Sequence, residues 1–161
     1  MEKIVTQQIV FKREEIRQQL QHIEPNSIFT MHQLIYYPYH FFSYSIQTRK
    51  WIKVSGKIGC TIDLISGRGS LIDAPLRWQK KILQPRQKKL QYRIKEQEAT
   101  KIADKFIFQA ASHQLKFFTA PIIKLIECKM FYRPFWIVKQ ERDGNENTFI
   151  VDAVSAHYHP L

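Results

Sequence analysis

Cysteine is scarce in this sequence of 161 residues, which contains two, Cys60 and Cys128. Neither belongs to a Cys-x-x-Cys pair, so the spacing excludes a zinc ribbon and a thioredoxin-like redox motif. Two cysteines in a chain of this length also exclude a small fold held together by several disulfides. Both lie in apolar stretches, and we therefore predict that both are reduced thiols in the core.

Long uninterrupted apolar runs are missing as well. The most apolar window, residues 120–138, is interrupted by four charged residues, Lys124, Glu127, Lys129 and Arg133. Such interruptions argue against an ordinary membrane-spanning segment. The first eight residues contain no apolar core of the kind found in signal peptides. We therefore expect a cytoplasmic protein without a transmembrane segment.

Signatures of catalysis are absent from the sequence. It has no nucleophile elbow, dinucleotide fingerprint or P-loop, and the Ser-Gly-Arg-Gly of residues 66–69 is better interpreted as a turn. His157 and His159 would share one face of a strand near Asp152, but a metal site needs three well-placed ligands, and these histidines lie close to the end of the sequence. We predict no catalytic residue, metal or cofactor, and we expect that the protein is not an enzyme.

Acidic residues are few: 14 against 25 lysines and arginines, which gives a formal charge of +11. The stretch from Ala74 to Lys95 contains eight cations and no acid, whereas the other residues contain 17 cations and 14 acids. A concentrated basic stretch favours an anionic partner. Its candidate anion-binding or nucleic-acid-binding residues are Arg77, Trp78, Lys80, Lys81, Arg86, Lys88, Lys89, Tyr92 and Arg93.

Three interpretations of this basic stretch are open. It can be a solvated linker over residues 74–91, which Pro75 and Pro85 favour because they break it into short pieces. It can bind nucleic acid, with Trp78 and Tyr92 stacking on bases while the cations meet phosphates. It can also be a basic helix that contacts an acidic membrane surface, or a surface for an acidic protein.

Two helices are visible in the spacing of apolar residues. In residues 99–110 apolar side chains recur at steps of three and four, and Lys101, Asp104 and Lys105 fall on the opposite face. In the first half Ile16, Leu20 and Ile23 form a thinner apolar stripe, which Pro25 ends.

Strands follow each helix. Residues 42–47 and 58–64 alternate apolar and small or polar side chains, which predicts strands with one buried face. In the second half, residues 136–138 and 149–154 flank Asp143-Gly144, and this dipeptide indicates a hairpin.

Three pairs of short segments recur in the same order in both halves of the chain. Residues 9–16 align with 92–99, residues 36–39 with 132–135, and residues 62–66 with 151–155. The repeat anchors are Pro38 with Pro134 and Asp63 with Asp152, and we predict structural roles for these aspartates in turns. We therefore predict an α+β fold with two tandem helix-plus-antiparallel-sheet units, residues 1–73 and 92–161, related by internal duplication.

The repeated segments resemble the PepSY type of repeat. The resemblance is carried by the charged helix start at residues 95–103, by the Tyr-x-Pro-aromatic segments and by the closing segments 62–67 and 151–155. It covers residues 9–67 and 92–156, and Ala156 stands where the motif carries glycine. It implies a cystatin-like unit, one helix packed on an antiparallel sheet, and a family that binds or regulates other proteins.

The function expected from these patterns is a non-catalytic protein-interaction or regulatory module with a protein partner. The alternative is a nucleic-acid-binding protein that uses the basic aromatic stretch of residues 77–95. The sequence leaves the oligomeric state open.

Overall fold

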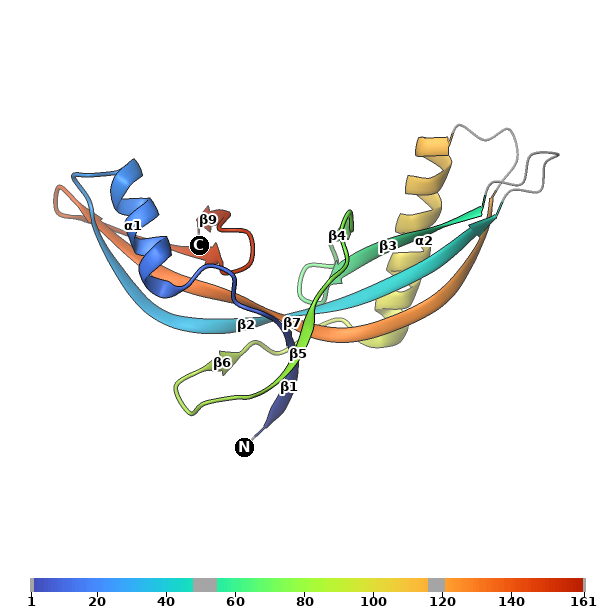
Figure 1. The fold of residues 1–161 in the computed structure, drawn as a ribbon, viewed down its shortest axis with the longest axis horizontal. Coiled ribbons are helices and arrows are strands. Elements are labelled where there is room, and N and C mark those ends of the chain that lie inside the picture. The colour runs from blue at the N-terminus through green and yellow to red at the C-terminus, as the bar shows by residue number, and fades with distance from the viewer. Residues whose placement is uncertain (1, 48–54, 116–120, 161) are drawn as a thin grey trace. The chain divides into compact units, whose positions relative to one another are not determined.

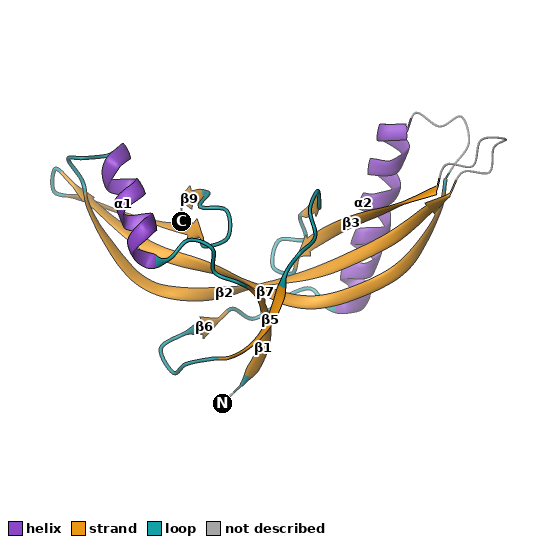
Figure 2. Ribbon diagram, viewed as in Figure 1, coloured by secondary structure: helices purple, strands orange, loops and turns teal. Residues whose placement is uncertain are grey.

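Strands make up most of the described chain (Figure 2). The computed structural model describes residues 2–47, 55–115 and 121–160. Within these ranges the elements follow one another as in Figure 1: β1 (Lys3–Gln7), α1 (Arg13–Ile23), β2 (Ile28–Gln47), β3 (Ser55–Asp63), β4 (Gly69–Leu71), β5 (Trp78–Ile82), β6 (Lys88–Lys89), α2 (Glu96–Leu115), β7 (Ile122–Arg142), β8 (Asn145–Asp152) and β9 (Tyr158–Pro160). The α+β class is confirmed.

The sheet is mixed, whereas the sequence predicts antiparallel strands. Its order is β4-β3-β2-β7-β1-β5, while β6 pairs with β2 and β8 lies between β7 and β9. Two contacts are parallel: β1 meets β7 at Thr6 and Tyr132, and β6 meets β2 at Ile35 and Tyr36. Neither pair is joined by a tight turn, so no hairpin forces these strands to run in opposite directions.

The chain divides into two compact units that are discontinuous in sequence. Unit 1 contains residues 1–37, 77–90 and 132–161, and unit 2 contains residues 38–76 and 91–131. The contiguous boundaries expected from the sequence, 1–73 and 92–161, therefore differ from these units. The difference arises because β2 and β7 continue through Pro38 and Pro134 and each contributes residues to both units.

The core of unit 2 is formed by α2 on β2 and β3. Ala99, Ala103 and Ile107 are fully buried on one face of α2, which is the face predicted from the apolar spacing. Alanines at two of these positions let the helix backbone approach the sheet closely. They pack against fully or nearly fully buried residues of β2 and β3, and of the turn that follows β3, namely Phe42, Tyr44, Cys60, Ile62 and Leu64.

The core of unit 1 is formed by α1 on a different set of strands. Ile16 and Leu20 are buried against β2, β7 and β8. Ile23 is 63% exposed, so its predicted place in the apolar stripe is wrong, because α1 ends at this residue. The strand residues of this core are Phe29, Met31, Val138, Phe149 and Val151.

Each helix is therefore packed on the hairpin of the other half of the sequence. The backbone N–H groups of Val10 and Phe11, just before α1, donate to Ala153 O at 2.9 and 2.8 Å. Those of Arg93 and Ile94, just before α2, donate to Leu64 O at 2.9 Å each. Strand β2 follows α1 and continues through Pro38 without a turn, so its second part belongs to unit 2. Strand β7 follows α2 and continues through Pro134 without a turn, so its second part belongs to unit 1.

The turns after β3 and β8 contain the same hydrogen bonds. Asp63 Oδ1 accepts from the N–H groups of residues 65 and 66, and Asp152 Oδ1 accepts from those of residues 154 and 155. Leu64 N–H donates to Pro38 O at 3.1 Å, and Ala153 N–H donates to Pro134 O at 3.0 Å. Both aspartates therefore shape turns, as the sequence predicts.

One position in these turns differs between the units. Gly67 has a φ of 79°, and Ala156, which makes the same backbone hydrogen bond, has a φ of 64°. A Cβ at Gly67 would also lie 3.3 Å from Ile94 Cδ1. Because left-handed backbone costs a residue with a Cβ about 1–2 kcal/mol, the alanine is the strained partner.

Exchanging these two residues should change stability in opposite directions. We expect Gly67→Ala to lower the free energy of unfolding by about 1 kcal/mol, because it adds backbone strain. We expect Ala156→Gly to raise it by up to about 0.5 kcal/mol, since the relief of strain is partly offset by the freer unfolded chain. Urea denaturation of both variants measures the difference, and a loss of stability in Ala156→Gly would contradict the role of this turn.

Candidate functional site

The residues predicted to bind anions are divided between the two units. The candidates from Arg77 to Lys89 lie in unit 1, directly before β5, on β5, on β6 and between these strands, whereas Tyr92 and Arg93 lie in unit 2 ahead of α2. The stretch is therefore more than a solvated linker, because β5 pairs along its whole length with β1. It contains no helix, which removes the interpretation as a basic helix on a membrane.

Two of the lysines contact aromatic rings. Lys81 Nζ lies 5.4 Å from the centre of the Tyr36 ring, and Lys89 Nζ lies 5.9 Å from that of Tyr132. Lys89 also forms an ion pair with Glu2. Both lysines are half-buried, so their charges serve contacts within unit 1.

The other cations of this segment are exposed. Arg77, Lys80, Arg86 and Lys88 all face solvent, and none of them takes part in an ion pair within the described residues. Residues 77–90 contain six cations and no acid, whereas the rest of unit 1 contains seven cations and eight acids. The positive charge of unit 1 is therefore concentrated on this segment.

A second surface, on β7 in unit 2, was missed by sequence reasoning. Ile122, Leu125 and Ile126 are 40%, 39% and 51% exposed. The apolar run of residues 120–138 was the available signal, but periodicity alone does not show which of its residues are uncovered. We call residues 122–128 of this strand the β7 edge.

The β7 edge is paired on one side. Strand β7 has β2, β1 and β8 as neighbours, but β1 reaches it at Tyr132 and β8 begins at the pair formed with Phe135. Among the described strands, the β7 edge thus has β2 alone beside it (Figure 1). In a strand with a neighbour on one side, every second residue directs its backbone N–H and C=O away from that neighbour.

The thiols are poor nucleophiles. Cys60 is fully buried, and this burial, with a smaller effect of Asp104, raises the pKa of its thiol to about 12. Cys128 is exposed, so its predicted place in the core is wrong. Its Sγ lies 3.8 Å from Glu96 Oε1, and partial burial together with this carboxylate raises its pKa. Both shifts disfavour the thiolate that nucleophilic chemistry requires.

The polar side chains elsewhere serve the fold. His40 is buried and stacked on Phe42 at 4.6 Å between ring centres, and burial lowers its pKa. Tyr44 donates a hydrogen bond to Asp104 Oδ1 at 2.7 Å, and its pKa is raised by burial and by this contact. In unit 1 the Arg133 guanidinium pairs with Asp152 at 2.7 Å. In the part of the chain that the structure describes, no three His, Cys, Asp or Glu side chains are grouped to hold a metal.

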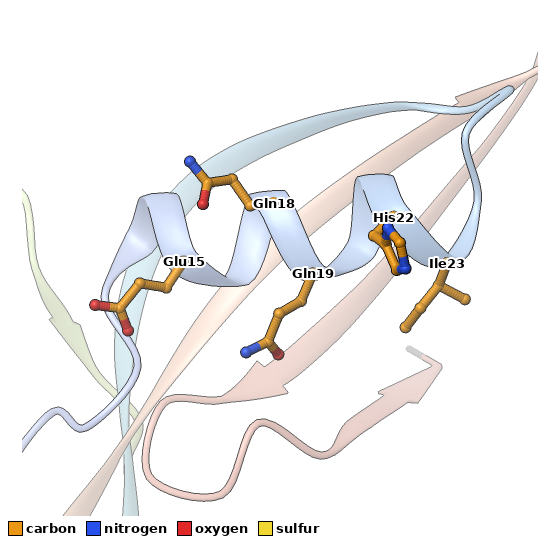
Figure 3. Close-up of a pocket in the computed structure, with 5 residues that line it drawn as sticks. All are labelled: Glu15, Gln18, Gln19, His22 and Ile23. Atoms are coloured by element: carbon orange, nitrogen blue, oxygen red, sulfur yellow. The ribbon is translucent and has the colours of Figure 1, made fainter.

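A shallow hollow runs along α1. Figure 3 shows its five lining residues, Glu15, Gln18, Gln19, His22 and Ile23, and all come from this one helix. A surface built by a single helix does not enclose a substrate, because ligand sites need walls from several elements.

Comparisons with known proteins give no relative. No family model, curated protein or solved structure matches the chain. Across residues 2–47, 55–115 and 121–160, neither helix has the length and apolar character needed to cross a membrane.

Proposed function

We propose that the chain is a non-catalytic protein-interaction module in which the β7 edge binds an extended segment of another protein. The observation that carries this proposal is a strand edge with three exposed apolar side chains, Ile122, Leu125 and Ile126, beside backbone groups that no described strand pairs. Natural sheets usually protect such edges, because an open edge is a template for another strand. An added strand gains main-chain hydrogen bonds, and its alternate side chains contact the exposed apolar residues.

Charges on the β7 edge limit unselective association. Lys124 and Glu127 are exposed and interrupt the apolar residues, which makes pairing with an arbitrary apolar strand unfavourable. Unit 2 as a whole contains twelve cations and six acids. We therefore expect a partner segment that combines alternating apolar residues with acidic ones.

A further feature supports this kind of module. The equivalent hydrogen bonds around Asp63 and Asp152 are those expected of duplicated helix-on-sheet units. We further propose that the duplication is of the PepSY-like kind, whose members bind other proteins, and that the protein works in the cytoplasm.

Selection of peptides tests the proposal. A displayed library of extended peptides is selected on the full chain, and binders are measured against Leu125→Gln/Ile126→Gln. Binding should weaken at least about tenfold, because burial of a Leu or Ile side chain contributes about 1.5–3 kcal/mol. The matched control is Phe108→Gln, which removes an apolar side chain that is 46% exposed on α2 of the same unit.

Hydrogen exchange locates the bound segment. The amides of residues 122–128 should become protected when the selected peptide binds. Equal binding to the double variant, or protection confined to other strands, would overturn the proposal. Thermal unfolding of both variants shows whether the exposed positions can be changed without loss of the fold.

A further inference from the structure

The two charged residues of the β7 edge stand on either side of two apolar ones. Lys124, Leu125, Ile126 and Glu127 follow one another along the strand, and all four side chains are exposed. Neither charge takes part in an ion pair within residues 2–47, 55–115 and 121–160. They do not pair with each other, because residues three apart in a strand are separated by about 10 Å and lie on opposite faces. The β7 edge therefore presents one cation and one anion at a fixed spacing.

This spacing defines a complementary pattern in a partner strand. Directly opposite residues of two paired strands share a face, where opposite charges stabilise the pair and like charges destabilise it. The best partner thus has an acid opposite Lys124 and a cation opposite Glu127. Apolar residues between them cover Leu125 and Ile126, which are 39% and 51% exposed. In an antiparallel partner, the slightly more stable arrangement, the cation comes first and the acid last.

A second copy of the chain does not provide this pattern through its own β7 edge. Two identical edges pair about a twofold axis, and residues that meet across this axis lie on the same face of their strands. Lys124 and Glu127 are three residues apart and lie on opposite faces, so they do not meet across such an axis. The charges of the β7 edge therefore favour a segment of another protein over a second copy.

We propose that the partner of the β7 edge is an extended segment with the order cation, apolar, apolar, acid, which runs antiparallel to β7. This inference rests on the proposed function, because it specifies which segment the β7 edge binds. Lys124 and Glu127 set the direction and the register of the added strand, while burial of Leu125 and Ile126 supplies most of the affinity. The acid is the one expected from the positive charge of unit 2, and the cation opposite Glu127 is a further requirement.

The native thiol of Cys128 reports the direction of a bound peptide. Cys128 is exposed and directly follows Glu127, whereas Cys60 is fully buried. In the antiparallel arrangement, the residue before the peptide's cation lies opposite Cys128, and the residue after its acid lies opposite Ile123. Directly opposite side chains are close enough for a disulfide.

Two peptides with the same cation-apolar-apolar-acid core test the inference on the full chain. One has a cysteine before the cation and the other has a cysteine after the acid, and each cysteine carries a pyridyl disulfide. Attack by the Cys128 thiolate releases pyridine-2-thione and leaves a disulfide between the peptide and the chain. The peptide with the cysteine before the cation should link at least about tenfold faster, because the other places its cysteine several residues away from Cys128.

Exchanging the two charges of the β7 edge should move the linkage. Lys124→Glu/Glu127→Lys keeps the net charge, but it matches the charges of the same peptides in the parallel direction. The ratio of the two linkage rates should therefore fall by at least about tenfold, and the peptide with the cysteine after the acid should gain. The matched control, Glu98→Lys/Lys101→Glu, exchanges two exposed charges of α2 and should leave this ratio unchanged.

The outcomes separate this inference from the proposed function. Equal linkage of the two peptides, or a ratio that the charge exchange leaves unchanged, would overturn the charge order and the direction. If such peptides still lose binding with Leu125→Gln/Ile126→Gln, the β7 edge remains a binding site. Peptides that do not bind, together with a selection that returns no binder, would overturn the proposed function as well. A dimer of the free chain that Leu125→Gln/Ile126→Gln abolishes would show that a second copy occupies the edge, which also overturns the inference.

Discussion

Residues 1–73 and residues 74–161, produced as separate chains, are each expected to lack a stable monomeric fold. In the first fragment, α1 is separated from Val138, Phe149 and Val151, which cover Ile16 and Leu20 in the intact chain. In the second, Ala99, Ala103 and Ile107 of α2 lose the strands on which they pack. Neither core can form from one fragment, because each needs a helix and a hairpin from different halves.

Mixing the two fragments should restore the fold. Circular dichroism and urea denaturation should show a cooperative transition for the mixture, and sedimentation should show a complex of one copy of each. A fragment that folds by exchanging elements with a second copy of itself would sediment as a dimer. This result agrees with cores in which the helix and the hairpin come from different halves of the sequence. A fragment that is monomeric and unfolds as cooperatively as the intact chain would contradict the packing of each helix on the hairpin of the other half.

A chain that ends at His157 serves as the control for truncation. It lacks the short outer strand β9 and keeps both sets of core residues. It should therefore remain folded as a monomer, although it is somewhat less stable than the intact protein.

Ile107→Ala is expected to lower the free energy of unfolding by about 2–5 kcal/mol. The Ile107 side chain is fully buried in the core of unit 2, where α2 meets β2 and β3. Its truncation removes apolar contacts and leaves a cavity that the surrounding strands fill only in part. This is a large fraction of the total stability of a domain of ordinary size.

The neighbouring position provides the matched control. Phe108 is 46% exposed on the other face of α2, so Phe108→Ala removes a larger side chain but less buried surface. We expect a loss below about 1 kcal/mol, close to that of other surface substitutions. Urea denaturation at neutral pH measures both variants. Equal losses would contradict the assignment of the buried face.

Local patterns predicted the elements well. The spacing of apolar residues in 99–110 predicted α2 and its buried face, and alternation predicted the strands around residues 42–47 and 58–64. The Asp143-Gly144 turn is confirmed, with φ values of 51° and 77° between β7 and β8. These features depend on interactions over a few residues, so a sequence window contains what is needed to predict them.

Features that depend on distant segments were not predictable. The sequence suggested a linker at residues 74–91, but β5 in this stretch pairs with β1, which lies about 75 residues earlier in the chain (residues 78–82 with residues 3–7). It placed Cys128 and Ile23 in the core, and both are exposed. Whether an apolar side chain is covered depends on which distant strand or helix lies beside it, and a local pattern carries no such information.

The sequence by itself determined the class of the protein, its two helices, the hairpin turn and the aspartates that shape the closing turns, because these follow from spacing and from hydrogen bonds within a few residues. Only the tertiary structure decided that each helix packs on the hairpin of the other half, that the β7 edge has β2 alone beside it among the described strands, and that Lys80 of β5 shares a face with Lys3. The physical reason is that apolar burial is non-directional, so either hairpin could cover the apolar face of either helix. Because β2 and β7 continue through their prolines without a turn, each helix packs on the hairpin of the other half.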